Sequence, residues 1–329
     1  MKCPDFSRIV FGGTVFGWTV SSRKSHQLLN DFLSRGGVSL DTSDFYSEWA
    51  PGNMGGESET IIGHWMATQD LRTRVQVITK VGLLSRRRGL SRQNVIDAAN
   101  DSLKRLQTNY IDVYMPHRTP ELEEIEGFVS AIRYLFEVGS IKSVGFSHCE
   151  FEVLKNLMEE LIRKGIPISC VEDNFNLLER CLSQTVIPLT QSSNINFIAA
   201  RALAGGYLTG KYRGVRKNYH ARILLGQLSH TLSAGTKALK REYRSSLSSA
   251  SATGYIENEV LTLFEVIDSI SSKCNISPAS VVISWTLAQE GVEKVCISFR
   301  TRDQIKQLDL VELSGQETKL IELSVNKIQ

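Results

Sequence analysis

The sequence lacks the usual marks of a secreted, membrane-spanning or metal-binding protein. Its six cysteines are scattered and form no C-x-x-C pair or other metal-ligand spacing. No run of roughly eighteen or more apolar residues occurs, and the first residues lead into a strand-like segment without the apolar region of a signal peptide. We therefore expect a cytoplasmic protein with no membrane partner and no bound metal, in which most cysteines are buried free thiols. The cysteines are Cys3, Cys149, Cys170, Cys181, Cys274 and Cys296.

The sequence also has little net charge. The balance is +3 over 329 residues, of which 42% are hydrophobic and 22% charged, as in an ordinary domain with a sizeable core. One segment is uneven: residues 211–244 hold nine Lys or Arg and one acid, Glu242. This segment lacks regularly interleaved aromatic residues, so we do not expect a nucleic-acid partner.

Strand-like and helix-like segments alternate along the whole chain. Eight short apolar runs have the length and composition of buried parallel strands, and amphipathic segments separate most of them. The runs are Ile9–Phe11, Val38–Leu40, Val75–Ile78, Ile111–Tyr114, Ile141–Phe146, Ile168–Val171, Ile195–Ile198 and Val295–Ile297. Eight such repeats predict a closed (β/α)8 (TIM) barrel that spans residues 1–329 as a single domain.

The predicted helices carry recognisable start signals. The segment Asn94–Leu106 has an apolar stripe at helical spacing, and Ser91 is placed to cap it. Segments 152–164 and 259–272 have the same pattern, and Ser277-Pro278 opens a helix over 278–290. A G-x-G-x-x-G turn after the first strand is missing, so any dinucleotide would bind differently from the way it binds a doubly wound sheet.

Polar residues stand at the ends of three of these apolar runs. Asp41 follows Val38–Leu40, Lys80 closes Val75–Thr79, and His117 follows Ile111–Pro116, with Tyr46 five residues after Asp41. The carboxyl ends of barrel strands meet at one rim, where catalytic groups gather. An acid, an amine, an imidazole and a phenol at one rim predict a proton-transfer site.

Tyr46 needs neighbours to act in such a site. A free phenol has a pKa near ~10, too high for an efficient acid at neutral pH. A nearby ammonium stabilises the phenolate, and a buried carboxylate would hold that ammonium. Lys80 and Asp41 can take these roles because their strands are expected to be neighbours.

With these residues in place, the sequence resembles the aldo-keto reductases, in particular a bacterial-type branch. The similar segments follow the family's order over nearly the whole chain. They are Val15–Trp18, Leu40–Tyr46, Tyr46–Asn53, Gly56–Gly63, Thr79–Gly82, Asp112–His117, Gly139–Ser147, Asn174–Arg180, Leu203–Lys211, Ser277–Val281 and Phe299–Gln304.

The resemblance implies an NADPH-dependent oxidoreductase that reduces an aldehyde or ketone to an alcohol. Asp41, Tyr46, Lys80 and His117 match the family's catalytic tetrad. Tyr46 would protonate the carbonyl oxygen while hydride arrives from nicotinamide C4. Lys80, paired with Asp41, would lower the pKa of Tyr46, and His117 would orient the substrate.

The resemblance also implies a cofactor site. Its expected members are Gly13, Thr14, Asp41, Ser147, His148, Glu172, Arg201, Leu203, Gly205, Leu208, Gly210, Lys211, Ser298, Arg300 and Gln304. The guanidinium of Arg300 can grip a 2′-phosphate bidentately, which favours NADPH over NADH. The sequence departs from the family pattern at His148, Glu172, Ala200–Ala202, Ser298–Phe299 and Leu308.

The substrate, the basic loop and the class of protein leave alternatives open. Trp18 and Trp49 are expected to form an aromatic wall, with Tyr46 and His117, around a sugar or secondary-metabolite carbonyl. The long loop 211–255 is a solvated surface, a cover for the NADPH phosphates, or a site for an anionic substrate such as a nucleotide-linked keto sugar. The alternatives to a reductase are an NADPH-binding redox sensor with little turnover and a metal-dependent hydrolase using Asp41 and His117.

Overall fold

A computed structural model describes residues 6–211 and 256–326 of the chain. The chain divides into two compact units, which are described separately. The first consists of the described residues up to Asn174, Cys181–Ala200 and Glu290–Lys306. The second consists of Phe175–Arg180, the described part of Arg201–Gln289, and the described residues from Gln307 onward. The basic loop predicted over 211–255 lies, apart from Lys211, outside the described residues.

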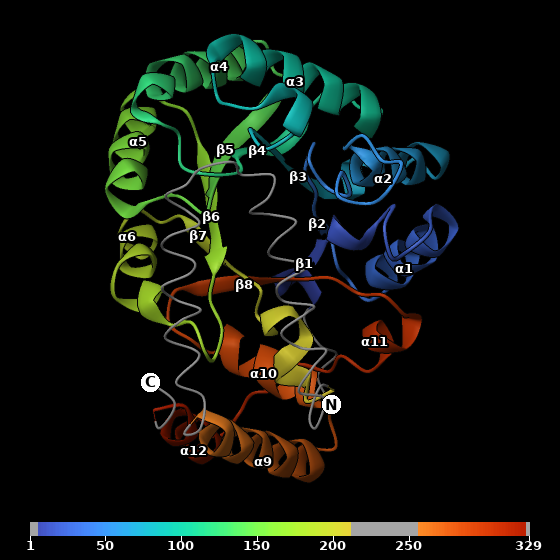
Figure 1. The fold of residues 1–329 in the computed structure, drawn as a ribbon, viewed down its shortest axis with the longest axis vertical. Coiled ribbons are helices and arrows are strands. Elements are labelled where there is room, and N and C mark those ends of the chain that lie inside the picture. The colour runs from blue at the N-terminus through green and yellow to red at the C-terminus, as the bar shows by residue number, and fades with distance from the viewer. Residues whose placement is uncertain (1–5, 212–255, 327–329) are drawn as a thin grey trace. The chain divides into compact units, whose positions relative to one another are not determined.

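The first unit contains a closed parallel barrel, as the sequence predicted (Figure 1). Eight strands follow one another in chain order, and β1 pairs with β8 to close the ring. The strands are β1 (Ile9–Gly12), β2 (Ser39–Asp41), β3 (Gln76–Val81), β4 (Ile111–Pro116), β5 (Ile141–Ser147), β6 (Ile168–Asn174), β7 (Asn196–Ala200) and β8 (Val292–Ile297). Every predicted strand is present, because each apolar run can be buried on both faces only within such a sheet.

Helices of the first unit lie outside the strand ring (Figure 1). They are α1 (Ser22–Ser34), α2 (Glu57–Thr68), α3 (Arg92–Leu106), α4 (Ile125–Glu137), α5 (Phe151–Arg163), α6 (Val186–Ser192) and α11 (Arg302–Lys306). The cap predicted for α3 is present, since the Ser91 side chain accepts a hydrogen bond from the Asn94 amide. Its apolar stripe, including Val95 and Ala99, is buried. The first unit is therefore a barrel of alternating strands and helices.

The barrel interior changes from apolar to polar along the strands. A buried apolar cluster contains Ile78 of β3 and Cys170 of β6. Two residues further along the same strands come Lys80 and Glu172, which are also buried. Residues two apart on a strand share a face, so Lys80 and Glu172 lie above the apolar layer, toward the carboxyl ends of the strands. This layer positions the candidate site.

The second unit contains three long helices. They are α9 (Ile256–Cys274), α10 (Pro278–Leu287) and α12 (Gly315–Val325), and α9 packs against the other two. Ser277 caps α10 by accepting from the Ser280 amide at 3.1 Å, as the sequence predicted. Lys273 donates to Glu317 at 2.7 Å, and this bond, with those from Ser314, lowers the pKa of Glu317 to about 2.

The cysteines of the described chain are all free thiols. Only Cys149 and Cys170 among them are buried, whereas Cys181 is exposed and the other two are half-buried. The prediction of mostly buried thiols is therefore wrong for the described residues. Across residues 6–211 and 256–326, none of the helices has the length and apolar character needed to span a membrane.

Candidate active site

The three strand-end residues and Tyr46 come together at the rim of the barrel. Asp41 ends β2, Lys80 is next to last in β3, and His117 follows β4. The Tyr46 hydroxyl donates to Asp41 Oδ2 at 2.9 Å. Lys80 Nζ donates to the Tyr46 oxygen at 3.0 Å and also to Asp41 Oδ1. All four side chains are buried, so this hydrogen-bond network is shielded from bulk water.

The loop that carries Tyr46 is fastened to the neighbouring strand. The Thr42 amide donates to the Ile78 carbonyl at 2.8 Å, and the Asp44 amide donates to the Lys80 carbonyl at 3.2 Å. A left-handed backbone at Ser47 (φ 73°) then turns the chain away from the rim. The strand pairing of β2 and β3 thus continues into the loop and fixes the phenol beside the ammonium.

His117 is held by a residue of the same loop. Its Nδ1 is hydrogen-bonded to Ser43 Oγ at 3.0 Å, and its ring lies 5.6 Å from the Tyr46 ring at an angle of 67°. The bond at Nδ1 fixes the orientation of the imidazole ring. The His117 ring is therefore held beside the Tyr46 ring.

Burial dominates the ionisation of this network. It lowers the pKa of Lys80, but the charges of Asp41 and Glu172 outweigh it, so the pKa lies well above its ordinary value. Burial and the charge of Glu172 raise the pKa of Asp41 to about 7, against the opposing effect of Lys80. Lys80 is therefore an ammonium at neutral pH, whereas Asp41 titrates there.

The Tyr46 phenol is neutral in this environment. Burial and the charge of Asp41 raise the pKa of Tyr46 well above its ordinary value, and the charge of Lys80 opposes them. Lys80 lowers the pKa of Tyr46, as the sequence predicted, but burial and the charge of Asp41 raise it by more. Tyr46 therefore keeps its proton at neutral pH.

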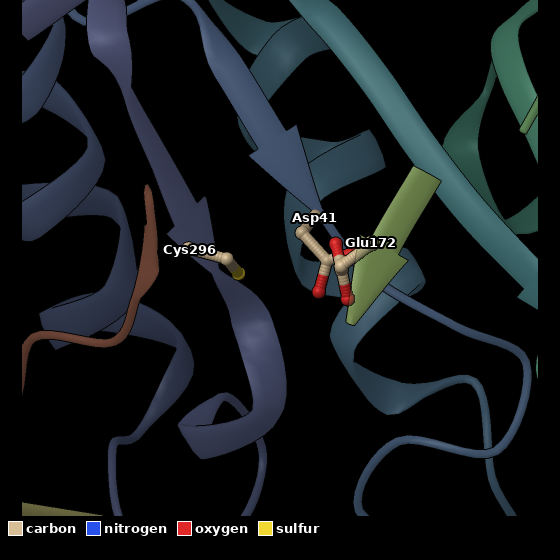
Figure 2. A group of neighbouring side chains, drawn as sticks. All are labelled: Asp41, Glu172 and Cys296. Atoms are coloured by element: carbon tan, nitrogen blue, oxygen red, sulfur yellow. The ribbon is translucent and has the colours of Figure 1, made fainter. Parts of the chain in front are cut away.

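Glu172 adds a second carboxylate to the network. Asp41, Glu172 and Cys296 converge from three strands, with one oxygen or sulfur atom of each within 4.8 Å of the others (Figure 2). Lys80 Nζ lies 3.5 Å from Glu172 Oε1 and supplies the cation between the carboxylates. Burial, Glu172 and Asp41 raise the pKa of the Cys296 thiol well above its ordinary value. The group does not include His117, which the hydrolase alternative requires.

Polar atoms without partners mark the ends of β5 and β6. Ser147 Oγ, Glu172 Oε2 and Asn174 Oδ1 are buried and have no hydrogen-bond partner among the described residues. Ser147 and Glu172 lie opposite each other in the sheet, and Asn174 is two residues further along β6. A hydroxyl donor beside two carbonyl-type acceptors is complementary to a carboxamide, which has one acceptor and two donors. These residues therefore fit the nicotinamide of the expected cofactor.

His148 lies next to Asp173 at the barrel rim. Its Nδ1 contacts Asp173 Oδ1 at 2.8 Å, its side chain is 40% exposed, and its backbone is left-handed (φ 50°). Burial opposes protonation, but the hydrogen bond and charge of Asp173 outweigh it and raise the pKa of His148. His148 and Asp173 thus form a pair at the rim.

The predicted adenosine-phosphate residues lie around the ends of β1 and β8. Thr14 Oγ1 and Ser298 Oγ are hydrogen-bonded at 3.1 Å. Gln304 Oε1 accepts from the amides of Arg300 and Thr301, so it caps α11. The guanidinium of Arg300 makes no hydrogen bond or ion pair within the described chain. Of this set, Arg300 is the group best placed to receive a ligand.

Gly13 has a structural reason to be glycine. A Cβ built there would lie 2.5 Å from Ser58 Oγ and 2.9 Å from the Asp41 carbonyl oxygen. The Ser58 hydroxyl donates to the Gly13 carbonyl at 3.0 Å. The close packing of these segments accounts for the glycine without a ligand.

The remaining predicted cofactor residues belong to the second unit and form one turn-rich segment. They are Arg201, Leu203, Gly205, Leu208, Gly210 and Lys211. Left-handed backbone occurs at Arg201 (φ 53°), Gly205 (φ 67°) and Gly210 (φ 76°) around the short helix Ala204–Thr209. Asn176 holds this segment by donating to the Arg201 carbonyl at 3.3 Å.

The two tryptophans predicted at the substrate pocket contact each other beside Tyr46. Trp18 and Trp49 meet edge to face with ring centres 5.8 Å apart, and Trp49 lies 6.3 Å from the Tyr46 ring. Trp18 is 46% exposed. The contacts extend an aromatic surface from the phenol to solvent.

Sequence reasoning missed three residues of this region: Ser43, Asn174 and Cys296. Asn174 could have been found from strand periodicity, because it follows Glu172 by two residues on β6. The same alternation places Cys296 inside β8, with Lys294, which donates to Ser39. Nothing in the pattern separates Ser43 from the other small residues of its loop.

Comparison with known proteins gives a consistent family. The family model described as "Aldo/keto reductase family" matches residues 8–322. The uncharacterized oxidoreductase YrpG of Bacillus subtilis is 27% identical over 323 residues, 94% of this chain and 88% of that protein. Aldo-keto reductase YhdN of Bacillus subtilis is 29% identical over 204 residues, 61% of this chain and 58% of that protein. The "uncharacterized 11.2 kDa protein in crtE 3′ region" of Pseudescherichia vulneris is 55% identical over 75 residues, 22% of this chain and 73% of that protein.

Proposed function

The chain belongs to the aldo/keto reductase family, a family of carbonyl-reducing oxidoreductases, and from this premise we propose that it reduces an aldehyde or ketone with NADPH, with Tyr46 as the general acid. The observation that supports the proposal is the pair of hydrogen bonds made by the Tyr46 hydroxyl. It lies within hydrogen-bond distance of both Lys80 and Asp41 in a buried site. A bound nicotinamide cofactor would supply the hydride.

The proton path follows from these contacts. Tyr46 gives its hydroxyl proton to the carbonyl oxygen as negative charge develops there. The ammonium of Lys80, 3.0 Å from the phenol oxygen, stabilises the phenolate that this transfer leaves. Asp41 keeps Lys80 in place through their ion pair. His117, held through Ser43, would orient the carbonyl oxygen of the substrate.

Binding of the cofactor is proposed to use the unpartnered atoms of β5 and β6. Ser147 would donate to the carboxamide oxygen, and Glu172 and Asn174 would accept from its amide nitrogen. Arg300 would bind the 2′-phosphate, which is the reason to prefer NADPH over NADH.

The aromatic surface of Trp18 and Trp49 indicates the kind of substrate. Rings placed edge to face offer a broad apolar wall, suited to a planar secondary-metabolite carbonyl or to the apolar face of a sugar. We propose a small-molecule substrate of one of these two classes. The proposal further places the protein in the cytoplasm as a single domain over residues 1–329.

One observation favours the sensor alternative. The proton of Tyr46 is directed to Asp41, and burial and Asp41 raise the pKa of the phenol, which makes it a weak acid in the free protein. A protein that binds NADPH but turns over slowly would satisfy the same contacts.

The test is turnover together with cofactor binding. The wild type should quench or shift NADPH fluorescence on titration and should consume NADPH absorbance with at least one member of a broad aldehyde and ketone panel. Tyr46→Phe should lose turnover by a factor of about 10³ or more and keep NADPH affinity within a few fold. Binding without turnover on any carbonyl would favour the sensor, and no binding of NADPH or NADH would refute both.

A further inference from the structure

The buried ammonium of Lys80 lies between two carboxylates. Asp41 accepts a hydrogen bond from it, and Glu172 Oε1 lies 3.5 Å away. The three residues are 0%, 1% and 3% exposed, in the order Lys80, Asp41, Glu172. If all three were ionised, one negative charge would remain without compensation in the barrel interior, which is strongly unfavourable.

Glu172 has few other contacts to stabilise a charge. A strong charge-assisted hydrogen bond to an ammonium spans about 2.7–2.9 Å, so its ion pair with Lys80 is a loose one. Its second oxygen, Oε2, has no hydrogen-bond partner among the described residues. The alternative to an uncompensated charge is a proton retained on one of the two carboxylates.

Among the described residues, no cation other than Lys80 is paired with Glu172. Titratable groups near Glu172 come from β2, β3, β8, the Tyr46 loop, the end of β5 and β6 itself. They are Asp41, Tyr46, Lys80, His148, Cys170, Asp173 and Cys296. The other cations of this region are His148, which is paired with Asp173, and Lys294 of β8, which donates to Ser39. The partner of Glu172 on β7 is Ile198, which is apolar.

We propose that Glu172 is a positioning residue for Lys80, and that Glu172 and Asp41 share one proton whose presence sets how strongly Lys80 stabilises the Tyr46 phenolate. With the proton bound, one negative charge balances Lys80 and its field reaches the phenol. With the proton lost, two negative charges surround Lys80 and the phenol becomes a weaker acid. The consequence for catalysis rests on the proposed function, but the shared proton does not.

Two electrostatic effects support the direction of this coupling. The charge of Glu172 acts, after burial, to raise the pKa of Asp41 to about 7. The same charge contributes to the raised pKa of Tyr46. Removing the charge of Glu172 should therefore make both Asp41 and Tyr46 stronger acids.

The direct test is infrared titration of the free full-length protein. The carbonyl-stretch band of a protonated buried carboxyl group should disappear with a midpoint near pH 7 in the wild type, following the raised pKa of Asp41. Glu172→Gln, which keeps the shape of the side chain, should lack this band because Asp41 alone balances Lys80. A band with an unchanged midpoint in Glu172→Gln would overturn the proposal.

A matched control separates this band from another buried carboxyl. Burial and Glu59 raise the pKa of Asp44 to about 8, so Asp44 should give its own band. Asp44→Asn should remove that band and leave the one that depends on Glu172. If Asp44→Asn removed both bands, the assignment to the Asp41–Glu172 pair would be wrong.

The kinetic test uses the same variants. In the wild type, kcat for NADPH-dependent carbonyl reduction should fall as pH rises through about 7, and this limb should be absent in Glu172→Gln. Glu172→Asp, which keeps the charge, should retain the limb. Identical profiles for the wild type and Glu172→Gln would contradict the coupling. If no carbonyl were reduced at all, the proposed function would fail, and the infrared titration would still decide whether the proton is shared.

Discussion

The two sides of the barrel rim differ in how their polar groups are satisfied. Around β2 and β3, Tyr46, Lys80 and Asp41 bond to one another, and Ser43 occupies a nitrogen of His117. Around β5 and β6, Ser147, Glu172 and Asn174 each have a buried polar atom without a partner in the described part of the chain. Buried polar groups are normally paired, so this difference supports the proposal that the first side performs the chemistry and the second receives a ligand.

Removing the central cation should break the side around β2 and β3 most severely. Lys80→Met leaves Asp41 and Glu172 facing each other without compensation, so we expect a loss of about 3–5 kcal/mol in the free energy of unfolding at neutral pH. NADPH-dependent turnover should be lost as well. Denaturant titration and steady-state assays would measure both effects.

An exposed lysine provides the control. Lys142→Met removes an ion pair with Asp112 in which the lysine side chain is 57% exposed, and should cost about 1 kcal/mol or less. Equal losses for Lys80→Met and Lys142→Met would show that the buried network contributes no special stability.

Asp44 differs from the other polar residues around β2 and β3. It lies on the same side of the rim, yet its Oδ2 has no partner among the described residues. Burial and Glu59 raise its pKa from 3.8 to about 8, so the unfolded chain loses this proton before the native protein does. Stability relative to Asp44→Asn should therefore be highest below pH 4 and should fall as pH rises toward 8.

We expect Asp44→Asn to gain about 1–3 kcal/mol over the wild type across this window. Parallel urea titrations at several pH values would measure it. A stability difference that is constant with pH would mean that Asp44 is ionised throughout, and that an unpartnered oxygen is no guide to a retained proton.

Ser43→Ala and Ser147→Ala remove one hydroxyl from each side of the rim, so together they compare the roles of the two sides. Ser43→Ala removes the hydroxyl bonded to His117 Nδ1, so kcat should fall about tenfold while NADPH affinity is kept. Ser147→Ala removes a buried hydroxyl that has no partner among residues 6–211 and 256–326, so NADPH affinity should fall about tenfold while stability is unchanged or higher. Fluorescence titration and steady-state kinetics on both variants separate these outcomes, and a reversed pattern would exchange the roles of the two sides.

The sequence predicted the barrel well because the signals for it are local. Each strand is an apolar run with turn residues around it, and helix starts such as Ser91 and Ser277 carry their own capping side chains. The same signals placed Asp41, Lys80 and His117 at strand ends. Their meeting followed from the rule that parallel strands end at one rim.

What the sequence could not predict depends on distances across the barrel. Glu172 and Cys296 come from strands far apart in sequence, and only barrel closure brings them within 4.8 Å of Asp41. The neutral state of Tyr46 likewise depends on burial, which outweighs the effect of Lys80 that sequence reasoning anticipated. The bond between His148 and Asp173 could not be predicted either, because it occurs at a left-handed residue that no residue type indicates.

The central claim is that the buried Tyr46, Lys80 and Asp41 network protonates a carbonyl while hydride comes from NADPH. Its most direct test uses NADPH deuterated at nicotinamide C4, with mass spectrometry of the alcohol formed from each carbonyl that is turned over. The account predicts deuterium in the product of the wild type and none from Tyr46→Phe under the same conditions, although both bind the cofactor. Deuterated product formed equally fast by Tyr46→Phe would contradict it.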